Sequence, residues 1–116
     1  MELTKKKPDL KFTHKELTFT VRAVATAGDK YEIDCLYDVK GDGLEINRRM
    51  FYLTLIERFV TGWEGVTENG KPVPFSLANL LSLPYDHEDD IVIILGSWIT
   101  NHVGIFKQAD DKKKGN

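Results

Sequence analysis

Residues 17–39, LTFTVRAVATAGDKYEIDCLYDV, determine the β-sheet that we expect this chain to form. Apolar and polar side chains alternate on both sides of residues 27–30 (AGDK), as they do in strands with one buried face. Glycine and aspartate in the central four residues are typical of a turn. We therefore expect a long antiparallel β-hairpin with strands at 17–25 and 31–39. In this hairpin the alternation makes Cys35 a small buried side chain.

Outside this hairpin, the spacing of apolar residues changes from that of strands to that of helices. Residues 10–13 (LKFT) can add one short strand before it. Apolar side chains then recur at helical spacing in three segments, residues 46–60, 76–83 and 86–106. The predicted fold class is therefore α+β. Its elements are an N-terminal antiparallel β-hairpin or three-stranded sheet, followed by about three helices packed on one face of it.

Residues with special backbone or capping roles mark the ends of these segments. Ser76 and Asp86 are expected to be helix N-caps, and Gly62 falls where a C-cap glycine would end the first helix. Asn69-Gly70 predicts a tight turn, because both residues tolerate a positive φ. Gly96 lies inside the last helical segment, which predicts a close backbone contact at that point.

The length and the charge distribution favour one acidic domain with basic ends. The chain has 116 residues, 16 of them basic and 18 acidic, and lysines are concentrated near both ends. We expect a flexible basic leader at residues 1–9, a single α+β domain at 10–106 and a disordered basic tail at 107–116. Because the body is acidic, nucleic-acid binding is disfavoured except through the tails.

Cysteine content and hydropathy indicate a cytoplasmic protein. Cys35 is the only cysteine, so an intrachain disulfide is impossible. The charged N-terminal residues lack the apolar core of a signal peptide. The longest apolar run, Ile91–Leu95, is far too short to cross a bilayer. These features predict an intracellular protein without a membrane partner.

Motifs for catalysis, metal binding or cofactor binding are weak throughout the sequence. Residues 38–49 resemble a calcium loop, but Lys40 and Arg49 occupy positions where that loop needs oxygen ligands. Residues 86–90 (DHEDD) lack a second histidine or cysteine at ligand spacing and fit the acidic first turn of a helix. We therefore predict no catalytic, metal-binding or cofactor-binding residue, and no enzyme. An enzyme would need an enclosed pocket with convergent polar groups.

Two residues have alternative interpretations. Trp63 lies between Gly62 and Gly65, so it is either a packing anchor for the Asn-Gly turn or an exposed anchor for a partner. His102 falls on the apolar face of the last helix, which predicts a core or interface histidine.

Residues 60–76, VTGWEGVTENGKPVPFS, and the Leu80-Leu81 pair that follows carry a family resemblance. They resemble a pattern in small proteins of tailed-phage and prophage structural gene clusters, often described as tail assembly chaperones. The matching residues are Gly62, Trp63, Gly65, Val66, Gly70, Pro72, Pro74, Phe75 and Leu80. They cover about the middle fifth of the chain, and the flanking helices match in type and order.

The resemblance implies a non-enzymatic chaperone in the cytoplasm of a bacterial host. It would bind a tape-measure or tail-tube protein during virion assembly. The candidate partner-binding residues are Trp63, Phe75, Gly62, Gly65 and Pro74. The alternative is a minor tail or head–tail joining protein that stays in the virion as an oligomer, formed through a sheet edge or the last helix. A third interpretation is a small DNA-associated regulator that uses its Lys-rich ends.

Overall fold

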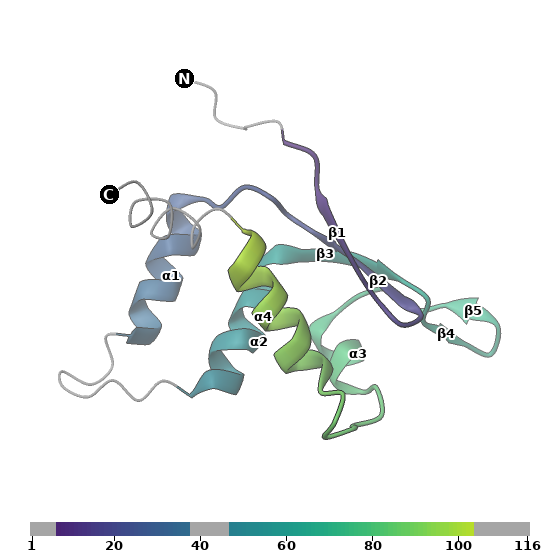
Figure 1. The fold of residues 1–116 in the computed structure, drawn as a ribbon. Helices are drawn as coiled ribbons and strands as arrows, with labels where there is room; N and C mark the ends of the chain where they lie inside the picture. The colour runs from purple at the N-terminus through teal and green to yellow at the C-terminus, as the bar shows by residue number, and fades with distance from the viewer. Residues whose placement is uncertain (1–6, 38–46, 104–116) are drawn as a thin grey trace.

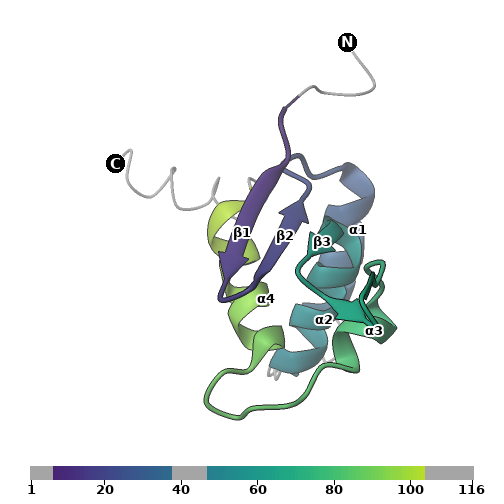
Figure 2. The same ribbon diagram turned by 90° about the vertical axis from the view of Figure 1, so that its right-hand side faces the viewer.

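The computed structural model describes residues 7–37 and 47–103 (Figure 1). The sheet strands are β1 (Leu10–His14), β2 (Leu17–Val21) and β3 (Val60–Glu64). The helices are α1 (Ala27–Tyr37), α2 (Arg48–Phe59), α3 (Leu77–Leu81) and α4 (Ile91–His102). A small hairpin of β4 (Thr67–Glu68) and β5 (Lys71–Pro72) projects from one end. Figure 2 shows the strands in front of the helices, which confirms the predicted α+β class.

The sheet is antiparallel with the strand order β1-β2-β3. β1 and β2 form a hairpin with a two-residue turn, in which Lys15 has a φ of 56°. β3 pairs with the other edge of β2, and the register shifts between Thr20 and Val21. Since residues 22–59 separate these two strands, the sheet is completed by a contact between distant parts of the chain.

The predicted hairpin of residues 17–39 is wrong in its second strand. Residues 27–37 form α1, and β2 pairs with β1 and β3. The residues predicted as a turn are the first turn of this helix, where Thr26 and Asp29 exchange two hydrogen bonds in the manner of a capping box. Along α1, Ile33 is buried while Tyr31 and Cys35 are exposed, so the burial predicted for Cys35 is also wrong. Residues 38–39 lie outside the described ranges.

Strand β1 confirms the short strand expected at residues 10–13. Helix α2 confirms the first of the three predicted helical segments, but it ends before the predicted C-cap at Gly62. Asn47 caps the start of α2, where its side chain accepts a hydrogen bond from the Met50 amide. The C-cap is Val60, from which the chain continues directly into β3. Gly62 therefore lies in a strand opposite Thr20, and its predicted role as a C-cap is wrong.

The two C-terminal helices confirm one predicted cap and correct the other. The Ser76 hydroxyl accepts a hydrogen bond from the Asn79 amide at 3.0 Å, as expected of an N-cap. The N-cap of α4 is Asp90, whereas Asp86 closes a turn by accepting from the Glu88 amide. Residues 86–89 thus precede the helix, because the Asp90 carboxylate takes up the free amide at its start.

The core lies between the sheet and the pair of helices α2 and α4. α4 buries Val92, Leu95, Gly96 and Ile99. Gly96 confirms the expected close contact, because a Cβ there would overlap the Tyr52 side chain. His102 is exposed and stacks on Trp98 at 4.1 Å between ring centroids, so it is not a core residue. The alternative role in an interface stays a prediction. The side chains completing the core are Phe19, Val21, Ile33, Leu55, Ile56, Phe59, Val60, Leu80 and Val103.

No helix in the described parts of the chain combines the length and the apolar character needed to cross a bilayer.

Candidate functional site

An open groove of about 630 Å³ lies where the β1–β2 turn, the β3–β4 link, α3 and the start of α4 meet. Apolar side chains line part of it, among them Leu17, Val66, Leu80, Leu81 and Ile91. Leu80 is buried beneath the groove, whereas Leu81 is 54% exposed. Tyr85 is 72% exposed and also lines the groove. We name this surface the α3 groove. Its size corresponds to the volume of pockets that bind small ligands or several side chains.

The β1–β2 turn is joined to the α3–α4 connection across the α3 groove by ion pairs. Asp89 contacts His14 Nε2 at 2.7 Å and Lys15 Nζ at 2.8 Å. Hydrogen bonds from Lys15 and His14 hold the pKa of Asp89 below its ordinary value. These groups are partly or largely exposed, so the ion pairs position the turn but contribute little stability.

A further ion pair links α2 to the start of α4. Arg49 Nη2 donates to Asp90 Oδ2 at 2.6 Å, and this hydrogen bond lowers the pKa of Asp90. The Asp90 carboxylate also accepts the Val92 amide, so it caps α4 and binds Arg49 at once. Both residues line the α3 groove, which therefore has an apolar floor and a charged rim.

Gly65 fixes the distance between two walls of the α3 groove. Its φ is +105°, and a Cβ at this position would overlap the carbonyl oxygen of Glu16 in the β1–β2 turn. Only glycine combines this backbone conformation with such a close approach. Gly65 and Val66 both line the α3 groove, so the β3–β4 link forms one of its walls.

Trp63 and Phe75 pack against the core beside the wall that Gly65 and Val66 form. Trp63 is half-buried, and its Nε1 donates to the Val73 carbonyl at 2.7 Å. Phe75 packs edge-on against Trp63 with ring centroids 5.2 Å apart, and the ring centroid of Phe19 lies 6.1 Å from that of Trp63. Trp63 thus anchors the segment that carries the Asn69-Gly70 turn. In that turn both residues have positive φ, as predicted.

The five predicted partner-binding residues therefore have different positions. Gly65 lines the α3 groove, and Trp63 and Phe75 pack behind its wall. Pro74 is exposed, and its carbonyl accepts a hydrogen bond from the Asn79 side chain. Gly62 lies in β3 with no atom within 4 Å of the place of a Cβ. A contact between any of the five and a partner stays a prediction.

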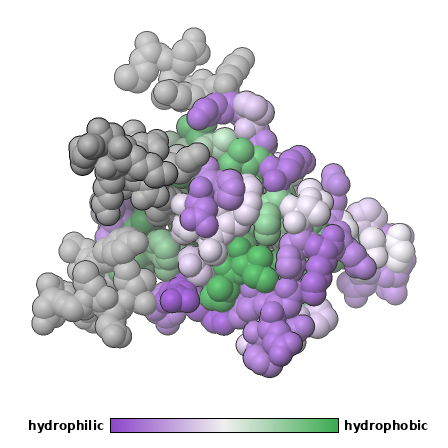
Figure 3. Space-filling view, in the orientation of Figure 1, coloured by the Kyte–Doolittle hydropathy of each residue, from purple (hydrophilic) through white to green (hydrophobic). Residues whose placement is uncertain are grey.

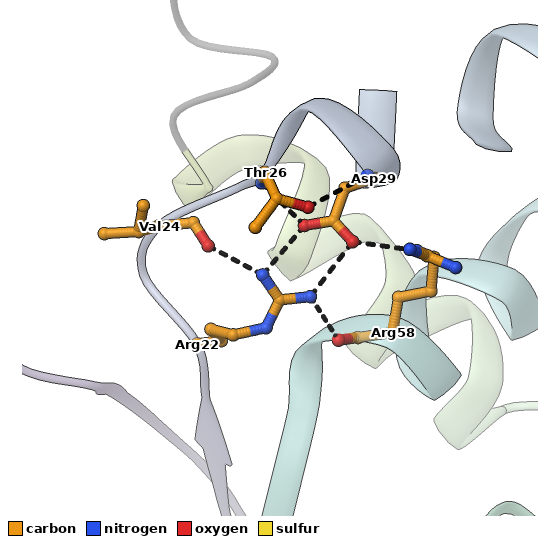
Figure 4. Close-up of polar contacts among 5 residues, drawn as sticks. All are labelled: Arg22, Val24, Thr26, Asp29 and Arg58. Carbon is orange, nitrogen blue, oxygen red and sulfur yellow. Dashed lines mark hydrogen bonds and ion pairs between the residues drawn. The ribbon is translucent and has the colours of Figure 1, made fainter. Parts of the chain in front are cut away.

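A separate charged cluster joins α1 to β2 and α2 (Figure 4). Asp29 is 1% exposed and accepts hydrogen bonds from both terminal nitrogens of Arg22, at 2.8 and 3.1 Å, and from Arg58 Nε at 2.8 Å. Arg22 also donates to the carbonyls of Val24 and Arg58. Burial alone would raise the pKa of Asp29. The hydrogen bonds from Arg22, Thr26 and Arg58 outweigh it and hold this pKa well below its ordinary value.

We name this cluster the Asp29 cluster, and we assign it a structural role. No buried side-chain nitrogen or oxygen atom in the described part of the chain lacks a hydrogen-bond partner. The Asp29 carboxylate is engaged within the cluster, because it accepts four hydrogen bonds, two from Arg22 and one each from Thr26 and Arg58. A buried carboxylate whose oxygens are engaged in this way is poorly suited to hold a ligand.

The described residues contain no group of three or more His, Cys, Asp or Glu side chains that could hold a metal ion. Of the possible calcium loop at 38–49, residues 38–46 lie outside the described ranges. The absence of a metal, a cofactor and an enzymatic activity stays a prediction.

Sequence reasoning missed both the α3 groove and the Asp29 cluster. One signal for the cluster was present, because Thr26-x-x-Asp29 has the spacing of a capping box and indicates a helix start. Of the partners of that box, Arg22 directly follows β2 and Arg58 lies in α2, and no local pattern links them.

No family model matches this chain, and searches of the curated proteins and of the solved structures also found no match.

Proposed function

We propose that this protein is a non-enzymatic assembly chaperone of a tailed phage or prophage. Its α3 groove would bind an apolar segment of a tape-measure or tail-tube protein in the bacterial cytoplasm. The observation that supports a binding role is the α3 groove itself, an open apolar surface with Leu81 and Tyr85 exposed. Exposed apolar surface is costly in water and commonly marks a site that a partner covers.

The shape of the α3 groove favours insertion of side chains over addition of a strand. Its walls are a β-turn, helix ends and the connection between α3 and α4. Its volume of about 630 Å³ fits a few large apolar side chains from one face of a helix. A tape-measure protein is a long helical chain that exposes such faces before the tail tube encloses it.

The segment that carries the family resemblance also forms part of this surface. Gly65 and Val66 line the α3 groove, and Leu80 lies at its base. Trp63 and Phe75 pack behind the wall formed by Gly65 and Val66. We therefore expect Trp63 to act by positioning this wall. Substitution of Trp63 should reduce stability and partner binding together.

Co-purification with identified tail proteins tests the proposal. The tagged protein is expressed together with separately cloned tape-measure and tail-tube proteins, as wild type and as Leu81→Glu. Leu81 is 54% exposed, so the charge enters the α3 groove without disturbing the core. Tyr31→Glu, on α1, is the matched control because Tyr31 is 68% exposed and lies outside the α3 groove.

We expect the wild type and Tyr31→Glu to retain one of the two tail proteins, and Leu81→Glu to lose it. Retention of neither tail protein by the wild type would refute the tail chaperone. Equal retention by Leu81→Glu would refute the α3 groove as the site. Recovery of the protein from purified virions would favour the alternative of a retained structural component.

A further inference from the structure

The rim of the α3 groove carries more acidic than basic side chains. Within the described part of the chain, its acidic lining residues are Glu16, Asp86, Asp89 and Asp90, and its lysine and arginine are Lys15 and Arg49. The remaining titratable groups on this surface are His14 and Tyr85. With both of these counted as neutral, four negative charges face two positive ones. The lining of the α3 groove is therefore acidic by two charges.

The surplus of negative charge lies on Glu16 and Asp86. Lys15 Nζ is 2.8 Å from Asp89, and Arg49 Nη2 is 2.6 Å from Asp90, so each cation is already engaged with one carboxylate. Among the described residues, neither Glu16 nor Asp86 forms an ion pair within 4.0 Å. Both residues are exposed. Their charges are therefore accessible to a partner that enters the α3 groove.

These two acidic residues belong to different walls of the α3 groove. Glu16 lies in the β1–β2 turn, where its carbonyl oxygen faces Gly65. Asp86 lies in the α3–α4 connection and accepts a hydrogen bond from the Glu88 amide at 3.0 Å. Figure 3 shows hydrophilic surface at this connection, next to the apolar patch over the N-terminal half of α4. A segment bound in the α3 groove would thus have apolar surface beneath it and acidic groups beside it.

The field of Asp86 extends to the rim of the α3 groove. The hydrogen bond to Asp89 raises the pKa of Lys15, and Coulombic attraction to Asp89 and Asp86 adds to this effect. One lysine therefore serves two carboxylates, and it is hydrogen-bonded to only one of them. A second cation, supplied by a partner, would compensate the charge that remains.

We propose that Glu16 and Asp86 make the α3 groove selective for apolar helical segments flanked by lysine or arginine; this inference rests on the binding role proposed above for the same groove. Lysine and arginine suit such a site because their aliphatic stems pack along apolar surface while their charged ends reach a polar rim. An acidic segment, or a phosphate backbone, would meet like charges there. The partner class is therefore a basic amphipathic helix.

Three labelled helical peptides test this selectivity. They share one stripe of leucines and differ only in the residues that flank it, which are all Lys, all Gln or all Glu. Fluorescence polarisation with the full chain measures their dissociation constants. We expect the Lys peptide to bind tightest and the Glu peptide weakest, with roughly a fivefold difference between them at low salt. This preference should diminish as the salt concentration rises.

A double variant and a matched control identify the residues responsible. Glu16→Gln combined with Asp86→Asn removes the two charges, and the asparagine keeps an oxygen that can accept the Glu88 amide. This variant should lose most of the preference. Glu32→Gln combined with Glu57→Gln removes the same charge from exposed positions on α1 and α2, outside the α3 groove, and should keep it.

A neutral substitution within the α3 groove identifies where the peptides bind. Leu81→Gln replaces a half-exposed apolar side chain of the groove without changing the charge, so it should weaken the binding of all three peptides. Binding by Leu81→Gln as tight as by the wild type would overturn the proposal.

The other outcomes are equally decisive. The proposal is overturned if the wild type binds none of the peptides, shows no preference, or prefers the Glu peptide. It is also overturned if the double variant keeps the preference or if the control loses as much of it. Because the peptides are not tail proteins, a wild type that prefers the Lys peptide but retains neither tail protein would refute the tail chaperone alone. Retention of a tail protein without any peptide preference would refute only this inference.

Discussion

Two aspartates of this protein are each held by two basic side chains, at opposite ends of the sheet. Asp29 lies between Arg22 and Arg58, and its side chain is 1% exposed. Asp89 lies between His14 and Lys15, and its side chain is 24% exposed. The contact distances are similar, at 2.7 to 2.8 Å. The two clusters therefore differ mainly in access to water.

This difference indicates which of the two clusters stabilises the fold. Water screens an exposed ion pair and replaces its contacts when one partner is lost. In a buried cluster, loss of the carboxylate leaves cations that water solvates poorly. The Asp29 cluster should therefore hold α1 in place, whereas the Asp89 pairs adjust the position of a turn beside the α3 groove.

The largest effect is expected from Asp29→Asn. The substitution keeps the shape but removes the charge that pairs with Arg22 and Arg58. The free energy of unfolding should fall by about 3 kcal/mol, because the two arginines lose their counter-charge but are themselves partly exposed. Urea unfolding measures this change. Asp34→Asn is the control on the same helix, since Asp34 forms only an exposed pair with Lys30. Equal effects of the two substitutions would contradict the structural role of the cluster.

The pairing of the Asp29 carboxylate with Arg22 and Arg58 should also make stability depend on pH. A carboxyl whose pKa is lower in the folded state stabilises the fold above its unfolded pKa, and this contribution is lost as the pH falls towards the folded value. The folded pKa of Asp29 is lowered, so stability should decline below about pH 5, near the upper end of the ordinary titration of aspartate. Urea midpoints between neutral and acidic pH measure the decline. It should be clearly shallower in Asp29→Asn, and an unchanged slope would argue against Asp29 as its source.

Near the α3 groove, backbone shape should matter more than charge. Gly65→Ala forces a side chain into a positive φ and against the Glu16 carbonyl, which should cost about 2 kcal/mol. Gly62→Ala is the matched control, because the space around Gly62 is open and its φ is not positive. Thermal and urea unfolding of both variants measure the difference. A Gly65→Ala variant as stable as Gly62→Ala would show that the β1–β2 turn can move away from residue 65 without a loss of stability.

The smallest effect is expected from Asp89→Asn. Its partners are exposed or half-exposed, and water replaces them when the charge is removed. The melting temperature should stay close to that of the wild type, at low as well as high salt. A loss as large as that of Asp29→Asn would mean that burial is not what distinguishes the two clusters.

The sequence predicted the local parts of this fold well and its long-range parts poorly. Ser76 and the Asn69-Gly70 turn were recognisable, because a cap or a tight turn depends on neighbouring residues. Alternation over residues 31–37 suggested a strand, but α1 is helical and Ile33 is its buried anchor. The third strand of the sheet comes from residues 60–64, far along the chain, so no local pattern identified it as the partner of β2.

The candidate site was predictable only through its individual residues. Trp63 and Gly65 stood out by their type and spacing, but their positions relative to the α3 groove depend on the β1–β2 turn. The cap at Asp90 was missed in favour of Asp86, because four acidic residues in five offered competing helix starts. Arg49 resolves this choice in the folded chain by binding Asp90 from another helix.

The strand order also has a consequence for synthesis on the ribosome. The β1–β2 hairpin is made first, but an isolated two-stranded hairpin is at best marginally stable in water. Its third strand follows only after residues 22–59, and closing a loop of that length costs entropy before β3 can pair with β2. The nascent hairpin should therefore stay largely unstructured until α2 and β3 have left the exit tunnel. The sheet is then expected to form late, in one cooperative step with the packing of α2 and α4.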